Sequence, residues 1–77
     1  MNKKVYDVVM SGKADNNLDF NDFKNLIESL GFILRRQSGS HRFYKHPNGI
    51  VMNIQPKGSK AKPYQVAQLR DIIKGGL

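Results

Sequence analysis

Three strand-like runs in succession, each bounded by a turn signal, are the feature that most limits the folds open to this chain. The runs are "FILRRQ", "HRFYKH" and "IVMNIQ", at residues 32–37, 41–46 and 50–55. The turn "SGS" separates the first two, and the hairpin signal "PNG" separates the last two. This series predicts a three-stranded antiparallel meander.

Helical patterns flank the strand-like runs on both sides. Before them, Asp19 can cap a helix with apolar residues on one face, and Gly31 is suited to end it. After the runs, Pro63 fits the first turn of a closing helix. Helices on one side of the sheet would bury its apolar face and leave the other face in contact with water. The fold class predicted is therefore α+β, with the order α-β-β-β-α.

The N-terminal segment adds one element to this order. Residues 3–11 place Val5, Val8 and Val9 at helical spacing, which predicts a short helix that ends near Gly12, followed by a polar connector. Because 77 residues suit one small core, residues 1–77 are expected to form a single domain in which residues 1–17 are an N-terminal extension.

Alternation along the strands predicts which side chains face the helices. In the third run, Ile50, Met52 and Ile54 should point inward. The middle run is ambiguous because both of its faces mix aromatic, basic and histidine side chains. Phe43 is the residue of that run expected in the core, and His41 is expected at the start of the strand.

Charge is distributed unevenly along the chain. The net charge is +7, and no carboxylate occurs between Glu28 and Asp71. Eight cationic residues lie in that interval: Arg35, Arg36, Arg42, Lys45, Lys57, Lys60, Lys62 and Arg70. A concentrated positive field of this kind attracts phosphate backbones.

His41 follows directly on the Ser38-Gly39-Ser40 turn, whose hydroxyl and N–H groups could hold a phosphate oxygen beside the imidazole. Imidazole exchanges a proton readily near neutral pH, so His41 is the candidate catalytic residue for attack on a phosphodiester. His46 could be a second acid or base, although a turn residue is the favoured interpretation. The candidate RNA-binding residues are Ser38, Gly39, Ser40, Arg36, Arg42, Tyr44 and Lys45 around this histidine, with Lys57, Lys60 and Lys62 in the basic loop at residues 56–62.

Neither a metal site nor another cofactor is expected. The chain has no cysteine and two histidines, and the basic interval lacks the carboxylates that a two-metal nuclease requires. Without a metal to activate water, the 2′-hydroxyl of RNA is the convenient nucleophile. RNA is therefore the expected substrate rather than DNA.

The motifs together resemble one known family. "GF" at the end of a helix, "GSH" before the second strand, an aromatic pair, "HP" and "KAKPYQVAQLRDII" resemble the HicA-type mRNA interferase toxins over residues 18–74. The resemblance implies a double-stranded-RNA-binding-like fold, RNA cleavage by the histidine of "GSH", which is His41 here, and a HicB-type antitoxin as partner. It assigns no role to residues 1–17.

Two other classes of protein fit the same composition. A non-catalytic double-stranded-RNA-binding module has the same order of elements, and an adaptor could use the basic face to dock an acidic protein. The histidine of the "SGSH" turn favours the toxin, because a pure binding module does not need it. The first residues lack the apolar stretch of a signal peptide, so a cytoplasmic location is expected.

Overall fold

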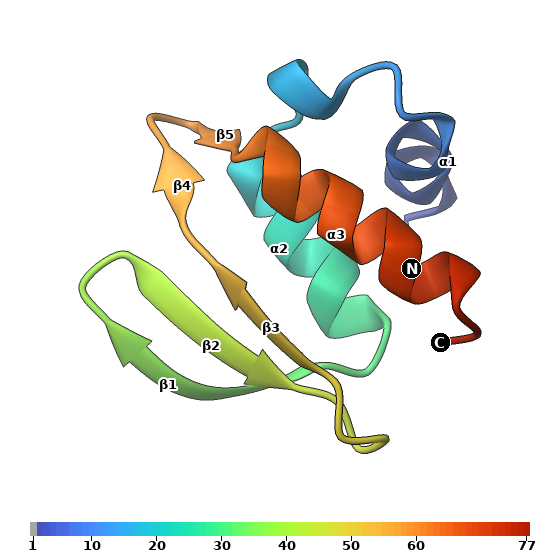
Figure 1. The fold of residues 1–77 in the computed structure, drawn as a ribbon. Coiled ribbons are helices and arrows are strands. Elements are labelled where there is room, and N and C mark those ends of the chain that lie inside the picture. The colour runs from blue at the N-terminus through green and yellow to red at the C-terminus, as the bar shows by residue number, and fades with distance from the viewer. Residues whose placement is uncertain (1) are drawn as a thin grey trace.

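The computed structural model describes residues 2–77 and confirms the predicted order of elements (Figure 1). The helices are α1 (Lys3–Ser11), α2 (Phe20–Ser29) and α3 (Pro63–Lys74), with a short 3-10 turn, η1 (Asp15–Asn17). The strands are β1 (Ile33–Ser38), β2 (His41–Lys45), β3 (Val51–Ile54), β4 (Pro56–Lys57) and β5 (Lys60–Ala61). Across residues 2–77, none of the helices has the length and apolar character that crossing a membrane would require.

Strands β1, β2 and β3 form the predicted antiparallel meander, with β2 in the middle. Figure 1 shows α2 and α3 packed against one face of this sheet, and within residues 2–77 no helix covers the other face. The fold is thus an α+β arrangement of the double-stranded-RNA-binding type with an added N-terminal helix. Its open sheet face is available to a ligand.

The predicted ends of α2 are confirmed. Asp19 precedes the helix, and its side-chain Oδ2 accepts a hydrogen bond of 3.1 Å from the backbone N–H of Asp22. Gly31 follows the helix with a φ of 101°, a value that glycine adopts without strain and other residues do not. These two residues set where the chain enters the helix and where it leaves for β1.

Side-chain alternation in β3 is as predicted and His41 begins β2 as expected, whereas the prediction that Phe43 is the core residue of β2 was wrong. Met52 and Ile54 are buried, and Ile50 packs against the same core. In β2 the buried aromatic residue is Tyr44, at 1 % exposure, and Phe43 lies on the open face. The tyrosine is accommodated inside because its hydroxyl donates a hydrogen bond of 2.6 Å to Glu28 on α2, so its polar group is not left unpaired.

The N-terminal extension is part of the core. Val5 and Val9 of α1 are buried against the other helices. The guanidinium of Arg70 on α3 donates hydrogen bonds of 2.9 Å to the carbonyl oxygen of Val9 and to both carboxylate oxygens of Asp15. Arg70 therefore joins α3 to the N-terminal segment and does not contribute to the free positive field in which it was counted.

The basic segment at residues 56–62, predicted as a loop, contains a small hairpin made by β4 and β5. Gly58 takes a φ of 60° in its turn. Two backbone hydrogen bonds hold the hairpin to the start of α2: Ala61 N–H donates to Leu18 at 2.8 Å, and Phe20 N–H donates to Ser59 at 2.9 Å. This anchoring could not be read from the sequence, because its partners are about 40 residues away.

Candidate functional site

A tight turn places His41 at the start of β2. Gly39 has a φ of 59°, and the turn brings Ser38 directly opposite His41 in the sheet. Directly opposed residues of an antiparallel pair project from the same face, so Ser38 and His41 share the open face. The imidazole of His41 is exposed there.

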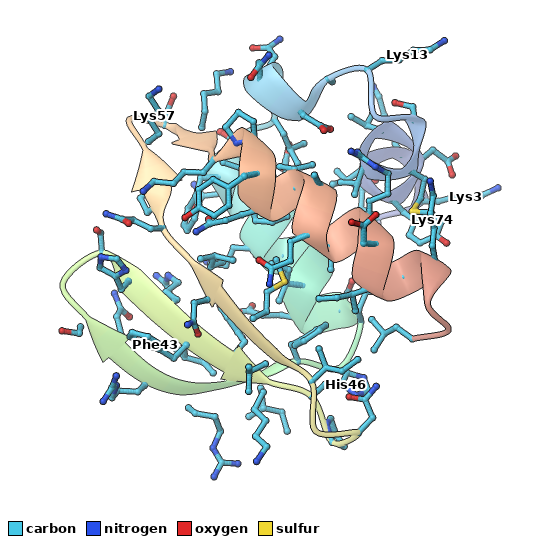
Figure 2. All side chains as sticks on the ribbon, in the orientation of Figure 1. Lys3, Lys13, Phe43, His46, Lys57 and Lys74 are labelled. Atoms are coloured by element: carbon cyan, nitrogen blue, oxygen red, sulfur yellow. The ribbon has the colours of Figure 1, made fainter. Side chains whose placement is uncertain are left out.

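An aromatic and cationic cluster adjoins His41 on this face. The rings of His41 and Phe43 are stacked, with centroids 6.3 Å apart and planes 20° apart. The guanidinium of Arg36 lies over the ring of Phe43, with its Cζ 4.4 Å from the ring centroid. Figure 2 shows Phe43 on the sheet, away from the helices. This arrangement holds a permanent positive charge on the same face of the sheet as the imidazole.

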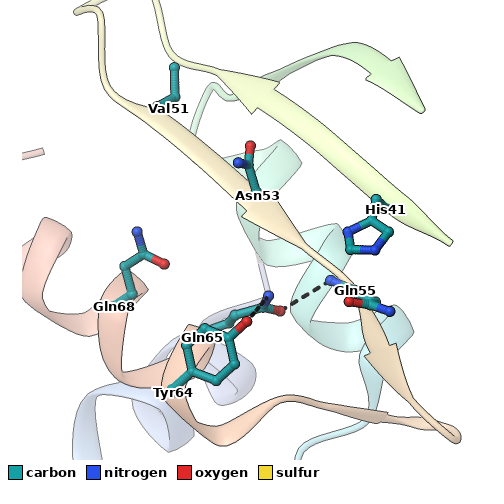
Figure 3. A pocket seen from close by; sticks show the side chains of 7 residues that line it. All are labelled: His41, Val51, Asn53, Gln55, Tyr64, Gln65 and Gln68. Carbon is teal, nitrogen blue, oxygen red and sulfur yellow. Dashed lines mark hydrogen bonds between the residues drawn. The ribbon is translucent and has the colours of Figure 1, made fainter. Parts of the chain in front are cut away.

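A cleft of about 390 Å³ extends from His41 across the edge of the sheet to α3 (Figure 3). On the strand side it is lined by His41, Val51, Asn53 and Gln55. On the α3 side it is lined by Tyr64, Gln65 and Gln68. The sequence indicated His41 as a candidate site residue, but it did not indicate that these polar residues would gather beside it.

Hydrogen bonds set the positions of three cleft residues. Gln65 is 5 % exposed; its side-chain oxygen accepts from the backbone N–H of Gln55, and its side-chain nitrogen donates to the hydroxyl of Tyr64, both at 3.1 Å. Lys62 Nζ donates to the side-chain oxygen of Gln55 at 2.9 Å. The start of α3 is therefore fastened to the chain just beyond β3, and this keeps the cleft in shape.

The structure brings together some of the predicted RNA-binding residues. Ser38, Gly39, Ser40 and Arg36 surround the exposed end of the sheet near His41. Lys57 and Lys60 are exposed on the β4–β5 hairpin, and Figure 2 shows Lys57 at its tip. Lys62 is half-buried, and its Nζ donates a hydrogen bond to the side chain of Gln55.

Two predicted RNA-binding residues of β2 lie away from His41. Arg42 pairs with Gln37 and Ile54, so it belongs to the row that faces the helix side of the sheet. Lys45 is exposed on the open face but at the other end of the strand, opposite Ile33 and Val51. Neither residue contributes its charge next to the imidazole.

Tyr44 cannot serve as the RNA contact that was expected. Its ring is enclosed in the core, and burial together with the hydrogen bond to Glu28 raises the pKa of Tyr44 to about 12. No aromatic face remains for a base to stack on. Phe43, the neighbour that was expected in the core, is the aromatic residue that β2 presents on the open face.

His46 has both ring nitrogens occupied by the fold. Its Nδ1 accepts from the backbone N–H of Asn48 at 3.1 Å, so Nε2 carries the proton and donates to the carbonyl oxygen of Leu30 at 3.0 Å. The ring also packs edge-on against Phe32, with centroids 5.1 Å apart. These contacts tie the β2–β3 turn to the end of α2, which is a structural role.

Acidic groups do not gather near this site. Among residues 2–77, no cluster of three histidine, cysteine, aspartate or glutamate side chains is positioned to hold a metal ion. The residues that the structure gathers around the cleft are suited to hydrogen bonding, stacking and proton transfer.

Comparison with known proteins matches most of the chain to a protein family. The family model described as "HicA toxin of bacterial toxin-antitoxin" matches residues 20–75. No curated protein and no solved structure matches the chain significantly. The matched region runs from α2 to α3 and includes the open sheet face, the β4–β5 hairpin and the cleft, whereas α1 lies outside it.

Proposed function

The chain belongs to the HicA toxin family and is the toxin of a toxin–antitoxin module, and we propose that it acts as a metal-independent endoribonuclease that cleaves mRNA with His41. The observation that carries this proposal is the exposed imidazole of His41, next to the Gly39 turn and a polar cleft. Arg36, held over Phe43, supplies a fixed positive charge on the same face. Proton transfer, phosphate attraction and space for a nucleotide are thus available together.

The proposed reaction uses the 2′-hydroxyl of the RNA as nucleophile. His41 takes the proton from this hydroxyl as its oxygen forms a bond to the adjacent phosphorus. The bond between phosphorus and the 5′-oxygen of the next nucleotide breaks, that oxygen takes a proton from water, and the hydroxide that remains takes back the proton held by His41. The products are a 2′,3′-cyclic phosphate and a 5′-hydroxyl, and no oxidant, reductant or metal ion is required.

Positive charge supports RNA binding in this proposal. The described surface carries Arg36 over Phe43 on the open sheet face and Lys57 and Lys60 on the β4–β5 hairpin. Contacts of this kind hold the phosphate backbone without reading its sequence, and their strength falls as salt rises. They would position the strand so that one phosphate comes to rest beside His41.

The partner proposed for the toxin is a HicB-type antitoxin, because membership of the family implies a cognate antitoxin. An acidic partner that covers the open sheet face would neutralise the net charge of +7 and block access to His41. Toxin and antitoxin would meet in the cytoplasm, where mRNA is present.

Two substrates and one chelator test the chemistry. Purified protein should cleave RNA equally well with and without EDTA, and a 2′-deoxy nucleotide at the scissile position should block cleavage. Loss of activity in EDTA would exclude the metal-independent reaction, and cleavage of the 2′-deoxy substrate would exclude the 2′-hydroxyl as nucleophile. Salt-dependent RNA binding with no cleavage at all would identify the protein as a non-catalytic binding module.

A further inference from the structure

The cleft beside His41 differs in chemistry from the rest of the protein. The chain has a net charge of +7, yet no lysine, arginine, aspartate or glutamate lines the cleft. Four of the seven lining residues carry a side-chain amide: Asn53, Gln55, Gln65 and Gln68. A phosphate would be held by cationic groups, whereas the edge of a nucleobase presents neutral donors and acceptors that amides can match.

Tyr64 supplies a flat aromatic surface to this cleft. Its side chain is 65 % exposed. Its hydroxyl accepts a hydrogen bond from buried Gln65, so the ring is held in place although it faces solvent. A fixed, exposed aromatic ring is a surface on which an unpaired base can stack with little loss of conformational freedom.

The amides of the cleft are arranged to bond a ligand in addition to one another. Lys62 Nζ donates a hydrogen bond to the side-chain oxygen of Gln55, so the amide nitrogen of Gln55 is the group that can donate to a ligand. Asn53 and Gln68 are exposed, on β3 and α3 respectively, and each can both donate and accept. Donors and acceptors therefore approach the cleft from both walls.

We propose that this cleft binds one unpaired nucleobase next to the scissile phosphate, by stacking on Tyr64 and hydrogen bonding to Asn53, Gln55 and Gln68. This inference rests on the proposed ribonuclease function. The cleft has a volume of about 390 Å³, which suits a small ligand. A base in a duplex has its pairing edge occupied, so the substrate is single-stranded RNA, or an unpaired part of a folded RNA.

Binding to abasic RNA tests the proposal independently of cleavage. The protein is His41→Ala, which binds without cutting, and the ligands are short single-stranded RNA oligomers in which one base at a time is removed and the backbone kept. Removal of the base that enters the cleft should weaken binding about 5- to 150-fold, the range expected for one stacked base, whereas removal of other bases should matter less. Fluorescence anisotropy measures these affinities.

Variants of the cleft complete the test. In the His41→Ala protein, Tyr64→Ala should weaken binding of intact RNA. It should also remove most of the penalty, which is the loss of affinity caused by removing the base that enters the cleft. Gln68→Ala should reduce that penalty in part. Both side chains are exposed, so neither change should unfold the domain. The matched control is Asn25→Ala, an exposed amide on α2 that does not line the cleft and should leave the penalty unchanged.

The outcomes separate this proposal from the one on which it rests. Suppose that wild type cleaves RNA and His41→Ala binds it. If no single base removal then weakens binding, or if the loss of affinity persists when Tyr64→Ala is added, the base-binding cleft is overturned and the ribonuclease proposal stands. Failure to bind any RNA oligomer would overturn both. A loss of affinity on base removal that is unchanged when Asn25→Ala is added to the His41→Ala protein, and that vanishes when Tyr64→Ala is added, supports the cleft.

Discussion

The hydroxyl of Tyr44 donates a hydrogen bond of 2.6 Å to the carboxylate of Glu28, which joins the middle strand of the sheet to α2. Side chains alternate along a strand, so an inward Tyr44 directs His41 and Phe43 to the opposite face. The contact that secures the core of this domain thus also determines which face carries the proposed catalytic residue.

Tyr44→Phe removes this hydrogen bond while keeping the ring in the core. We expect the free energy of unfolding to fall by about 1–2 kcal/mol, because the bond has a charged acceptor that is itself exposed. The control is Tyr6→Phe, which removes a hydroxyl at a partly buried position that packs against the core, whereas the bond to Glu28 is donated by Tyr44. Denaturant titration measures both variants, and equal losses would show that the bond to Glu28 adds no stability.

Alkaline pH should weaken the fold through the same residue. Burial, the hydrogen bond to Glu28 and the charge of that carboxylate raise the pKa of Tyr44 from 10.0 to about 12. The folded protein therefore keeps a proton that the unfolded chain has lost, so this contribution to stability is complete below about pH 10 and is lost as the pH rises through 12. The difference in unfolding free energy between wild type and Tyr44→Phe should shrink over that interval. A difference that stays constant would contradict the assignment.

The N-terminal helix should behave as part of the core. Val9 of α1 is 0 % exposed, so Val9→Ala is expected to lower the free energy of unfolding by about 2 kcal/mol through lost burial and an unfilled cavity. Val51→Ala makes the same change at a position that is 58 % exposed and should have little effect. Equal melting temperatures for the two variants would mean that α1 is only an appendage.

The hairpin lysines should bind RNA through its phosphates. Replacing Lys57 and Lys60 by glutamine should weaken binding across sequences and flatten the slope of log affinity against log salt by about 1.4, at roughly 0.7 per lost contact. Two exposed lysines on the helices α1 and α3, away from the hairpin, provide a control with the same change of charge: Lys3 and Lys74 (Figure 2). If the two double variants lose the same affinity, binding depends on net charge alone.

Local patterns were sufficient to predict most of the fold. Four predicted features depend on residues that are close in sequence, and the structure confirms all of them. They are the cap at Asp19, the glycine after α2, the hairpin after β2 and the inward-facing residues of β3. The orientation of β2 could not be obtained in this way. Its two faces are similarly mixed, and the bond that decides between them comes from Glu28, 16 residues earlier in the chain.

Long-range contacts also account for what sequence reasoning missed at the site. Arg70 was counted as a free cation because Asp15, its partner, is 55 residues away. Tyr64 was not singled out, although an aromatic residue next to a proline at the start of a helix was a signal that could have been used. Asn53 and Gln55 alternate outward along the third run, but only the packing of α3 brings them into one cleft with His41.

The cleavage rate of His41→Ala, measured together with its melting temperature, tests the proposed chemistry most directly. Loss of a proton-transfer group should slow RNA cleavage about 10²- to 10⁴-fold, and loss of an exposed side chain should leave the melting temperature nearly unchanged. His46→Ala should do the reverse: it breaks the bond to Leu30 and the packing on Phe32, so melting should occur at lower temperature while folded protein still cleaves. If His41→Ala keeps its fold and cleaves RNA at the wild-type rate, His41 is not the catalytic residue.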